Sequence, residues 1–256
     1  MDIKKDWQLP LDQYYQDTVT KKQICLHHTV GGSARSTFEY WRDNPERIGT
    51  AYIIERDGTI YEVFDPWYWA HHLGMKTVDN TQRNKESVGI ELASEGALKS
   101  GYQLNQQLGS KKFDEEWLYA FDIDTPPFAH AKKLYHTVND SLKYFDLIQP
   151  FRGYWYFDAY DAAQVKACIE LVNALCVQFK IPKALLPKGS RFVFNQVYAQ
   201  FNGVLSHCNV RADKSDLSPA WDWDALEASF LPVPTDSNFG FGGGGSGGGG
   251  ANSIGG

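Results

Sequence analysis

The stretch KKQICLHHTV, residues 21–30, joins a short apolar run to two adjacent histidines, His27 and His28. The run predicts a buried strand that opens into the loop GGSAR at residues 31–35. Successive side chains on a strand point to opposite faces of a sheet. At most one of the two histidines can therefore face a given pocket, and the stretch by itself does not decide which one does.

The rest of the chain alternates between strand-like and helix-like segments. Residues 50–64, TAYIIERDGTIYEVF, predict a hairpin that turns at Asp57-Gly58, and residues 86–94, ESVGIELAS, predict another buried strand. A strand-like run covers 194–210, and helices are predicted at 36–46, 161–181 and 223–231. This interleaving predicts a mixed α/β fold, in which helices flank one central, mostly β, sheet.

A single main domain is expected over residues 1–232, with an insertion at 97–158. The insertion is rich in Lys, Asp and aromatic residues, and we predict it to be partly helical around residues 129–147. It could shape substrate choice, contact another subunit or cover a sheet edge, and the sequence does not choose among these. Residues 233–256 include GFGGGGSGGGGANSIGG, which is typical of a flexible tail or linker.

The charge and the apolar pattern of the chain argue against two classes of partner. A formal net charge of −6 and a pI near 5.6 do not favour nucleic acid, since phosphate binding needs a basic face. No apolar run reaches the roughly 18 residues of a membrane span. The first residues lack the apolar core of a signal peptide, so we expect synthesis in the cytoplasm. The four cysteines form no CxxC pair, which favours reduced, buried thiols.

Two histidines and a carboxylate stand at predicted strand ends or in loops. His207 ends an apolar run, Asp216 follows it by nine residues, and one of the histidines after QICL completes the set. Two nitrogen ligands and one oxygen ligand, with a fourth position open to water, form the pattern of a catalytic zinc site. Glu91 is the candidate proton carrier, and Lys214 could stabilise an oxyanion. Each of these residues, taken alone, is also compatible with a purely structural role.

Five motifs in a fixed order carry a resemblance to a known family. The motifs are LHHT at 26–29, IGTAYIIERDGTIYEV at 48–63, AHHLG at 70–74, VGIEL at 88–92 and SHCNVRADKSDLSPAWDW at 206–223. Together they resemble the type 2 N-acetylmuramoyl-L-alanine amidases, a zinc family that includes phage lysozyme-amidases, a bacterial cytosolic anhydro-muropeptide amidase and the peptidoglycan recognition proteins. The resemblance covers roughly residues 20–96 and 158–230, and the last motif is the most specific.

The resemblance implies a role for each matching residue. His27 would be the first zinc ligand, so that His28 points away from the metal. The other two ligands of the Zn²⁺ would be His207 and Asp216. The remaining matches are the general base Glu91 and the catalytic Lys214 and, in or beside the substrate groove, His72, His28 and Thr50. Trp221, assigned to substrate binding, and Trp223 would lie in the core or in the groove wall rather than take part in the chemistry.

The chain also departs from the family pattern. Several relatives carry a tyrosine where this chain has Thr50, and Tyr52 would lie farther along the strand, which leaves Glu91 as the expected proton carrier. The loop from His207 to Asp216 is one residue shorter than in the bacterial cytosolic relatives. Cys208, next to the second histidine ligand, is expected to point elsewhere.

The activity implied by the resemblance is hydrolysis of the amide between N-acetylmuramic acid and L-alanine. The substrate would be polymeric peptidoglycan, with a bacteriolytic outcome, or a soluble muropeptide. The alternative is a module that binds peptidoglycan without cleaving it, which the complete ligand set argues against. Action would take place in the cytosol, or on the cell wall after release by a route that needs no signal peptide. The sequence does not indicate an oligomeric state.

Overall fold

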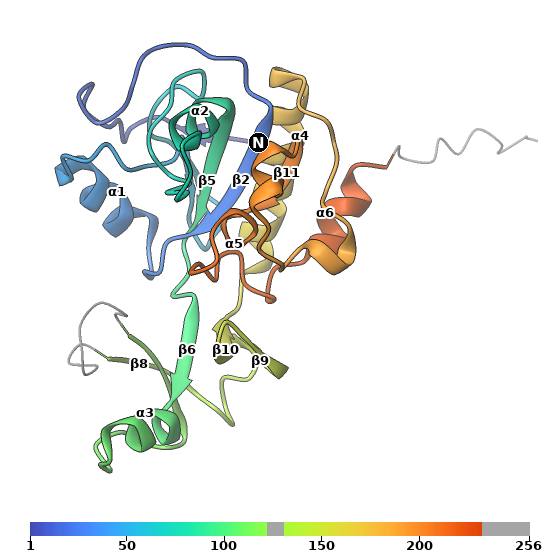
Figure 1. Ribbon diagram of the computed structural model, residues 1–256. Helices are drawn as coiled ribbons and strands as arrows, with labels where there is room; N and C mark the ends of the chain where they lie inside the picture. Colours follow the sequence, from blue (N-terminus) through green and yellow to red (C-terminus); the bar gives the residue numbers. More distant parts are fainter. Residues whose placement is uncertain (122–130, 232–256) are drawn as a thin grey trace, which may run out of the picture.

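The computed structural model describes residues 1–121 and 131–231. Within them, the main sheet has six strands in the order β1-β4-β3-β5-β2-β11 (Figure 1). The four strands β3, β5, β2 and β11 run parallel to one another, whereas β4 is antiparallel to β3. The predicted mixed α/β class is therefore confirmed. The strand bounds are β1 Ile3–Lys4, β2 Gln23–His28, β3 Tyr52–Ile54, β4 Ile60–Glu62, β5 Ser87–Leu92 and β11 Gly203–Ser206.

The helices of the main body pack around this sheet (Figure 1). The helices predicted at 36–46, 161–181 and 223–231 are confirmed as α1, α4 and α6. The strand-like run at 194–210 is a strand only at 203–206, because a 3-10 helix precedes it and a short helix follows it. The bounds are α1 Ala34–Asp43, α2 Asn80–Glu86, α4 Ala162–Phe179, α5 His207–Val210 and α6 Trp223–Ser229, with 3-10 helices at Lys188–Ser190 and Gln196–Gln200.

The predicted hairpin at 50–64 is confirmed as β3 and β4. Asp57 accepts a hydrogen bond from the backbone N–H of Thr59 at 2.9 Å, and Gly58 has a φ of +86°, which favours glycine. A Cβ at Gly58 would lie 2.7 Å from the backbone oxygen of Ala163, so the turn packs closely against the start of α4.

The two faces of the main sheet bury different apolar clusters. The larger cluster includes Ile24 and Leu26 of β2 together with Leu171 and Leu175 of α4. The smaller cluster, on the opposite face, includes Cys25 of β2. Alternation along β2 therefore places His27 on the face of Cys25 and His28 on the face covered by α4.

Helix α4 has the length and composition of a membrane span, with 18 residues and a mean hydropathy of 1.2. Core helices meet the same criteria, and Cys168, Leu171 and Val172 of α4 are buried in the larger apolar cluster. The expectation that no segment spans a membrane stays a prediction.

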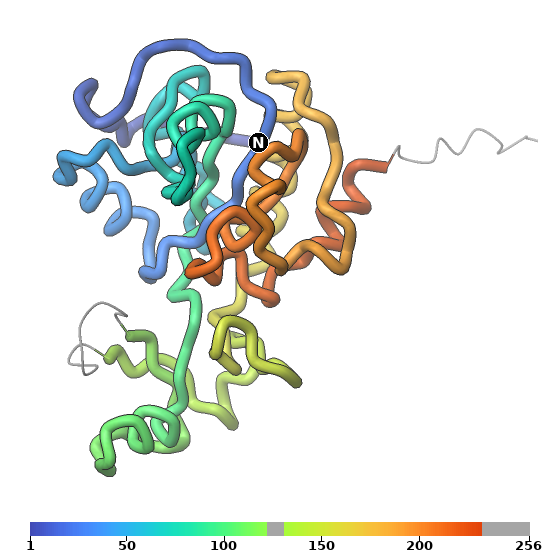
Figure 2. Tube along the Cα trace, viewed as in Figure 1, coloured from blue at the N-terminus to red at the C-terminus, as the bar shows by residue number. Residues whose placement is uncertain are grey.

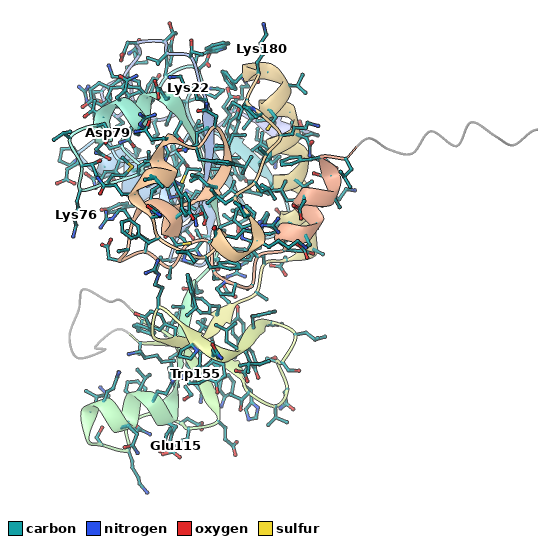
Figure 3. All side chains as sticks on the ribbon, turned by 45° about the vertical axis from the view of Figure 1, so that its right-hand side comes forward. Lys22, Lys76, Asp79, Glu115, Trp155 and Lys180 are labelled. Atoms are coloured by element: carbon teal, nitrogen blue, oxygen red, sulfur yellow. The ribbon has the colours of Figure 1, made fainter. Side chains whose placement is uncertain are left out.

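A second, antiparallel sheet projects from the main body between β5 and α4 (Figures 1 and 2). Its strands lie within residues 97–158, the segment predicted as an insertion, and follow the order β8-β7-β6-β10-β9. Figure 3 shows Glu115 and Trp155 on this projecting part, apart from the main body. The bounds are β6 Ala97–Ser100, α3 Gly101–Leu108, β7 Trp117–Ala120, β8 Lys132–His136, β9 Tyr144–Phe151 and β10 Tyr154–Asp158.

The predicted helix around residues 129–147 is wrong where the structure describes it, because residues 132–136 and 144–151 are strands. Strand β9 is rich in aromatic and branched apolar residues, which fit a pleated surface. Its reversal into β10 uses Arg152 and Gly153, both with positive φ. The first residues of that helix prediction, and the tail predicted at 233–256, lie outside the described residues.

The second sheet is fastened to the main body by the fully buried carboxylate of Asp158. Arg56, from the β3–β4 turn, forms an ion pair with it. The hydroxyl of Tyr135 donates to Oδ1 at 2.7 Å, and the backbone N–H of Glu95 and the hydroxyl of Ser94 donate to Oδ2 at 2.6 and 3.2 Å. These donors come from both parts of the molecule, so one acidic side chain connects them.

Replacement of Asp158 by alanine should lower the free energy of unfolding by about 3–5 kcal/mol, since it leaves a guanidinium and several donors without their acceptor. Asp146→Ala, at an exposed position of β9, is the control and should change it by less than about 0.5 kcal/mol. Urea unfolding of both variants at neutral pH provides the measurement. Equal losses in the two variants would contradict the role given to Asp158.

Candidate active site

The parallel strands of the main sheet bring the candidate residues to one edge. His27 lies opposite Glu91 in the register of β2 and β5, and Ser206, the last residue of β11, lies opposite Leu26. His207 follows directly. Because parallel strands end at the same edge of a sheet, all these side chains meet at the carboxyl ends of the strands, where open α/β sheets bind ligands.

His27, His207 and Asp216 converge in the structure. Oδ2 of Asp216 lies 3.0 Å from Nδ1 of His207 and 3.3 Å from Nδ1 of His27. One candidate ligand atom from each residue lies within 4.8 Å of the other two. The three residues are 3%, 7% and 5% exposed, so a cation between them would be nearly enclosed by protein.

This donor set fits Zn²⁺. Burial, followed by the neighbouring His207, lowers the pKa of His27 to about 4, so its imidazole is neutral at pH 7. Burial alone would raise the pKa of Asp216, but His207 and hydrogen bonds from both imidazoles lower it well below its usual range. Neutral imidazoles and an ionised carboxylate are the forms that bind zinc.

The two adjacent histidines have different surroundings. His27 contacts His207 and Asp216, as the resemblance implied for a ligand. His28 borders the cavity, but its Nδ1 lies 2.9 Å from the hydroxyl of Tyr160, on the α4 side of the sheet. The substrate-binding role expected for His28 stays a prediction, because this hydrogen bond equally fits a structural role.

A second group of candidate ligands, formed by Cys25, His27 and His72, overlaps the first. Cys25 is fully buried, and burial raises the pKa of its thiol well above the usual value. A protonated thiol is a poor metal ligand. Cys25 also does not line the cavity, so the group that contains Asp216 is the better metal site.

Glu91 and Lys214 line the same cavity as the three candidate ligands. Burial, followed by the charge of Asp216, raises the pKa of Glu91 well above its usual value, while Lys214 opposes the shift. A carboxyl group with a raised pKa can both accept and return a proton near neutral pH. Lys214 is half-buried and makes no ion pair with the described residues, so its ammonium is free to bind an anion.

The cavity has a volume of about 700 Å³ and extends from the candidate ligands to helix α1. Thr50 and His72 line it, whereas the hydroxyl of Tyr52 donates to Glu62 and does not reach it. Binding of substrate by Thr50 and His72 stays a prediction. Sequence reasoning did not identify Tyr40 of α1, which also lines the cavity. In the sequence, Tyr40 is simply an aromatic residue in a polar helix, and such residues are too common to indicate a site.

Of the two positions expected for Trp221, the core and the groove wall, the structure shows the core, and Trp221 does not line the cavity as a substrate-binding residue would. It is 3% exposed and belongs to the larger apolar cluster, where its ring packs edge-on against Tyr160. Cys208 is fully buried and does not line the cavity either, in agreement with the expectation that it points elsewhere.

The comparisons with known proteins agree with this geometry. Residues 17–219 match the family model described as N-acetylmuramoyl-L-alanine amidase, and the chain therefore belongs to that family. No curated protein sequence matches the chain. The match spans the three candidate ligands, Glu91 and Lys214, and also the second sheet.

Three solved structures illustrate the likeness. PlyL is 13% identical, with 91% of this chain and 98% of that chain covered and a TM-score of 0.49. The amidase AmiD from E. coli, in complex with anhydro-N-acetylmuramic acid-L-Ala-D-gamma-Glu-L-Lys, is 16% identical, with 85% and 60% covered and a TM-score of 0.48. The amidase LysC from Clostridium intestinale is 12% identical, with 89% and 96% covered and a TM-score of 0.42.

The lowered pKa of His27 predicts the pH dependence of stability in metal-free protein. The unfolded chain binds a proton at this residue below about pH 6.5, and the folded chain does so only below about pH 4. The free energy of unfolding should therefore fall as the pH drops from 6.5 to 4, by about 3 kcal/mol in total from His27. Urea unfolding after chelator treatment should show a shallower dependence in His27→Asn. An unchanged slope in that variant would contradict the assignment.

Proposed function

We propose that the chain uses Zn²⁺ to hydrolyse the amide between the lactyl group of N-acetylmuramic acid and L-alanine. The observation that carries the proposal is the convergence of His27, His207 and Asp216 in one cavity with Glu91 and Lys214. The family match makes peptidoglycan or a muropeptide the substrate class. A cavity of about 700 Å³ has the size of sites that hold small ligands, which suits one sugar and the start of a stem peptide.

His27, His207 and Asp216 would hold the metal ion. When bound, Zn²⁺ would polarise the amide carbonyl and make a water molecule more acidic. A carboxylate oxygen of Glu91 takes a proton from the attacking water, because burial strengthens its affinity for that proton. The same carboxyl group then gives the proton to the nitrogen of the leaving L-alanine. The ammonium of Lys214 neutralises the negative charge that develops on the carbonyl oxygen.

Whether the substrate is a soluble muropeptide or the polymeric wall decides where the chain would act. We propose that the chain acts either in the cytosol, on soluble muropeptides, or on the cell wall. Turnover on intact sacculi, compared with turnover on anhydro-N-acetylmuramic acid-L-Ala-D-gamma-Glu-L-Lys, separates these two settings. Faster release of stem peptide from sacculi would favour the wall.

The first test is the zinc content of the purified protein. We expect one zinc per chain in the wild type and in His136→Ala, whose histidine lies on β8 of the second sheet. His27→Ala should lose most of the metal, because one of three protein ligands is gone. A wild type that takes up no zinc, even when zinc is supplied, would overturn the proposal in favour of a module that binds peptidoglycan without cleaving it.

Glu91→Gln should keep the zinc and lower kcat by about 10²–10⁴-fold, since an amide of the same shape cannot take the proton. Glu95→Gln is the matched control, because Glu95 is also buried and follows the same strand, but pairs with Lys132 and does not line the cavity. Stem-peptide release and metal content are measured on both variants. Full turnover in Glu91→Gln would show that another group carries the proton.

A further inference from the structure

Both histidine ligands make a second contact, and both contacts go to consecutive residues. Nε2 of His207 lies 2.8 Å from the backbone oxygen of Leu73, and Nε2 of His27 lies 3.0 Å from Nδ1 of His72. In each ligand the other ring nitrogen, Nδ1, faces Asp216. The dipeptide His72–Leu73 therefore contacts both imidazoles on the side away from the metal site.

These contacts lie on the ring nitrogens that face away from Asp216. A carbonyl oxygen can only accept, so the contact with Leu73 is a hydrogen bond donated by Nε2 of His207. Nε2 of His27 and Nδ1 of His72 form the corresponding contact, in which either atom can donate. Nε2 of His72 is buried and has no hydrogen-bond partner among the described residues, so the contact with His27 is the hydrogen bond that they supply to this ring. Both contacts hold the imidazole rings in the orientation that turns Nδ1 toward the metal site.

The dipeptide is itself held by one buried side chain of α2. Oδ1 of Asn84 accepts hydrogen bonds from the backbone N–H groups of His72 and Leu73 at 2.7 and 3.0 Å. Its Nδ2 donates to the backbone oxygen of Asn80 at 2.7 Å. Asn84 is fully buried, so it cannot exchange these partners for water. A single amide thus fixes the backbone from which both contacts to the ligands arise.

The ring of His72 is also confined by β5. A Cβ at Gly89 would lie 3.1 Å from Nδ1 of His72 and 2.5 Å from Cγ2 of Thr50. Any larger residue at position 89 would push one of these two side chains away. Gly89 lies two residues before Glu91, so the strand that carries the proposed base also supports the ring beside His27.

We propose that His72 and Asn84 are positioning residues of the metal site. His72 holds the ring of His27 in place, and Asn84 acts through His72 and through the Leu73 carbonyl on both histidine ligands. This inference rests on the zinc-binding part of the proposed function. Loss of such partners around a metal site typically weakens metal binding about 10–100-fold.

The first experiment compares His72→Leu with His72→Asn. Asparagine keeps an acceptor oxygen near the place of Nδ1, and leucine has none. Zinc affinity, measured by competition with a chelator, should fall about 10–100-fold in the leucine variant and by much less in the asparagine variant. Unchanged zinc affinity in His72→Leu would overturn the role of His72.

The second experiment compares Asn84→Ala and Asn84→Asp with Asn105→Ala. Asn105 is the matched control, because it is also buried and bridges two backbone groups, both of Phe113, but it lies in α3 of the projecting segment. We expect Asn84→Ala to weaken zinc binding. Asn84→Asp should retain most of the zinc affinity, because aspartate keeps the acceptor oxygens. Asn105→Ala should bind zinc with the wild-type affinity. If Asn84→Ala and Asn105→Ala weakened zinc binding equally, Asn84 would have only a structural role, and the proposal would be overturned.

A readout without metal separates this inference from the proposed function. In zinc-free protein, NMR relaxation of the imidazole ring C–H groups should show rings of His27 and His207 that are as rigid as the backbone. In His72→Leu only the ring of His27 should become more mobile, and in Asn84→Ala both rings should. Wild-type protein that has rigid rings but takes up no zinc would count against the proposed function and not against the positioning. Rings that stay as rigid as in the wild type in both variants would overturn the positioning.

Discussion

The parallel register between β2, β5 and β11 is the constraint on which the site depends. It sets His27 beside Glu91 and brings His207 to the same edge, although these residues lie far apart in the sequence. A slip of one residue would turn His28 toward the site and His27 toward α4, because side chains alternate along a strand. A slipped register is disfavoured because both faces of β2 are buried. Cys25 packs in the smaller apolar cluster, and Ile24 and Leu26 pack in the larger one.

Burial shifts the pKa values of the residues at this edge of the sheet. It also carries a cost in solvation free energy. Two imidazoles, two carboxyl groups and an amide side chain are removed from water, and each needs a partner to offset the loss of solvation. The partners form a connected set: Asp216 lies between the ligands, His72 and Leu73 lie behind them, and Asn84 holds that pair. A divalent cation would complete this arrangement, since one candidate ligand atom from each of His27, His207 and Asp216 lies within 4.8 Å of the other two.

The sequence predicted the parts of the molecule that have strong local signals. The hairpin at Asp57-Gly58 and helix α4 follow from turn chemistry and apolar periodicity, and the candidate ligands follow from their motifs. The second sheet was not predicted, because its strands lack simple alternation and because its central pair, β6 and β10, lies at opposite ends of the segment. Trp221 and Asn84 show the same limit, since nothing in a motif distinguishes an aromatic residue of the core from one in a groove, or a helix-surface amide from a buried one.

The second sheet has the geometry of a segment that can be inserted into a domain or removed from it. Its first residue, Ala97, lies opposite Phe157, one residue before its last, so the chain leaves and re-enters the main body at neighbouring points. A segment whose ends lie side by side can be gained, lost or exchanged without displacing the elements that flank it. The junction follows the strand that carries Glu91 by only a few residues. Replacement of the second sheet is thus a route by which the surroundings of the cavity can change while β5 keeps its register with β2.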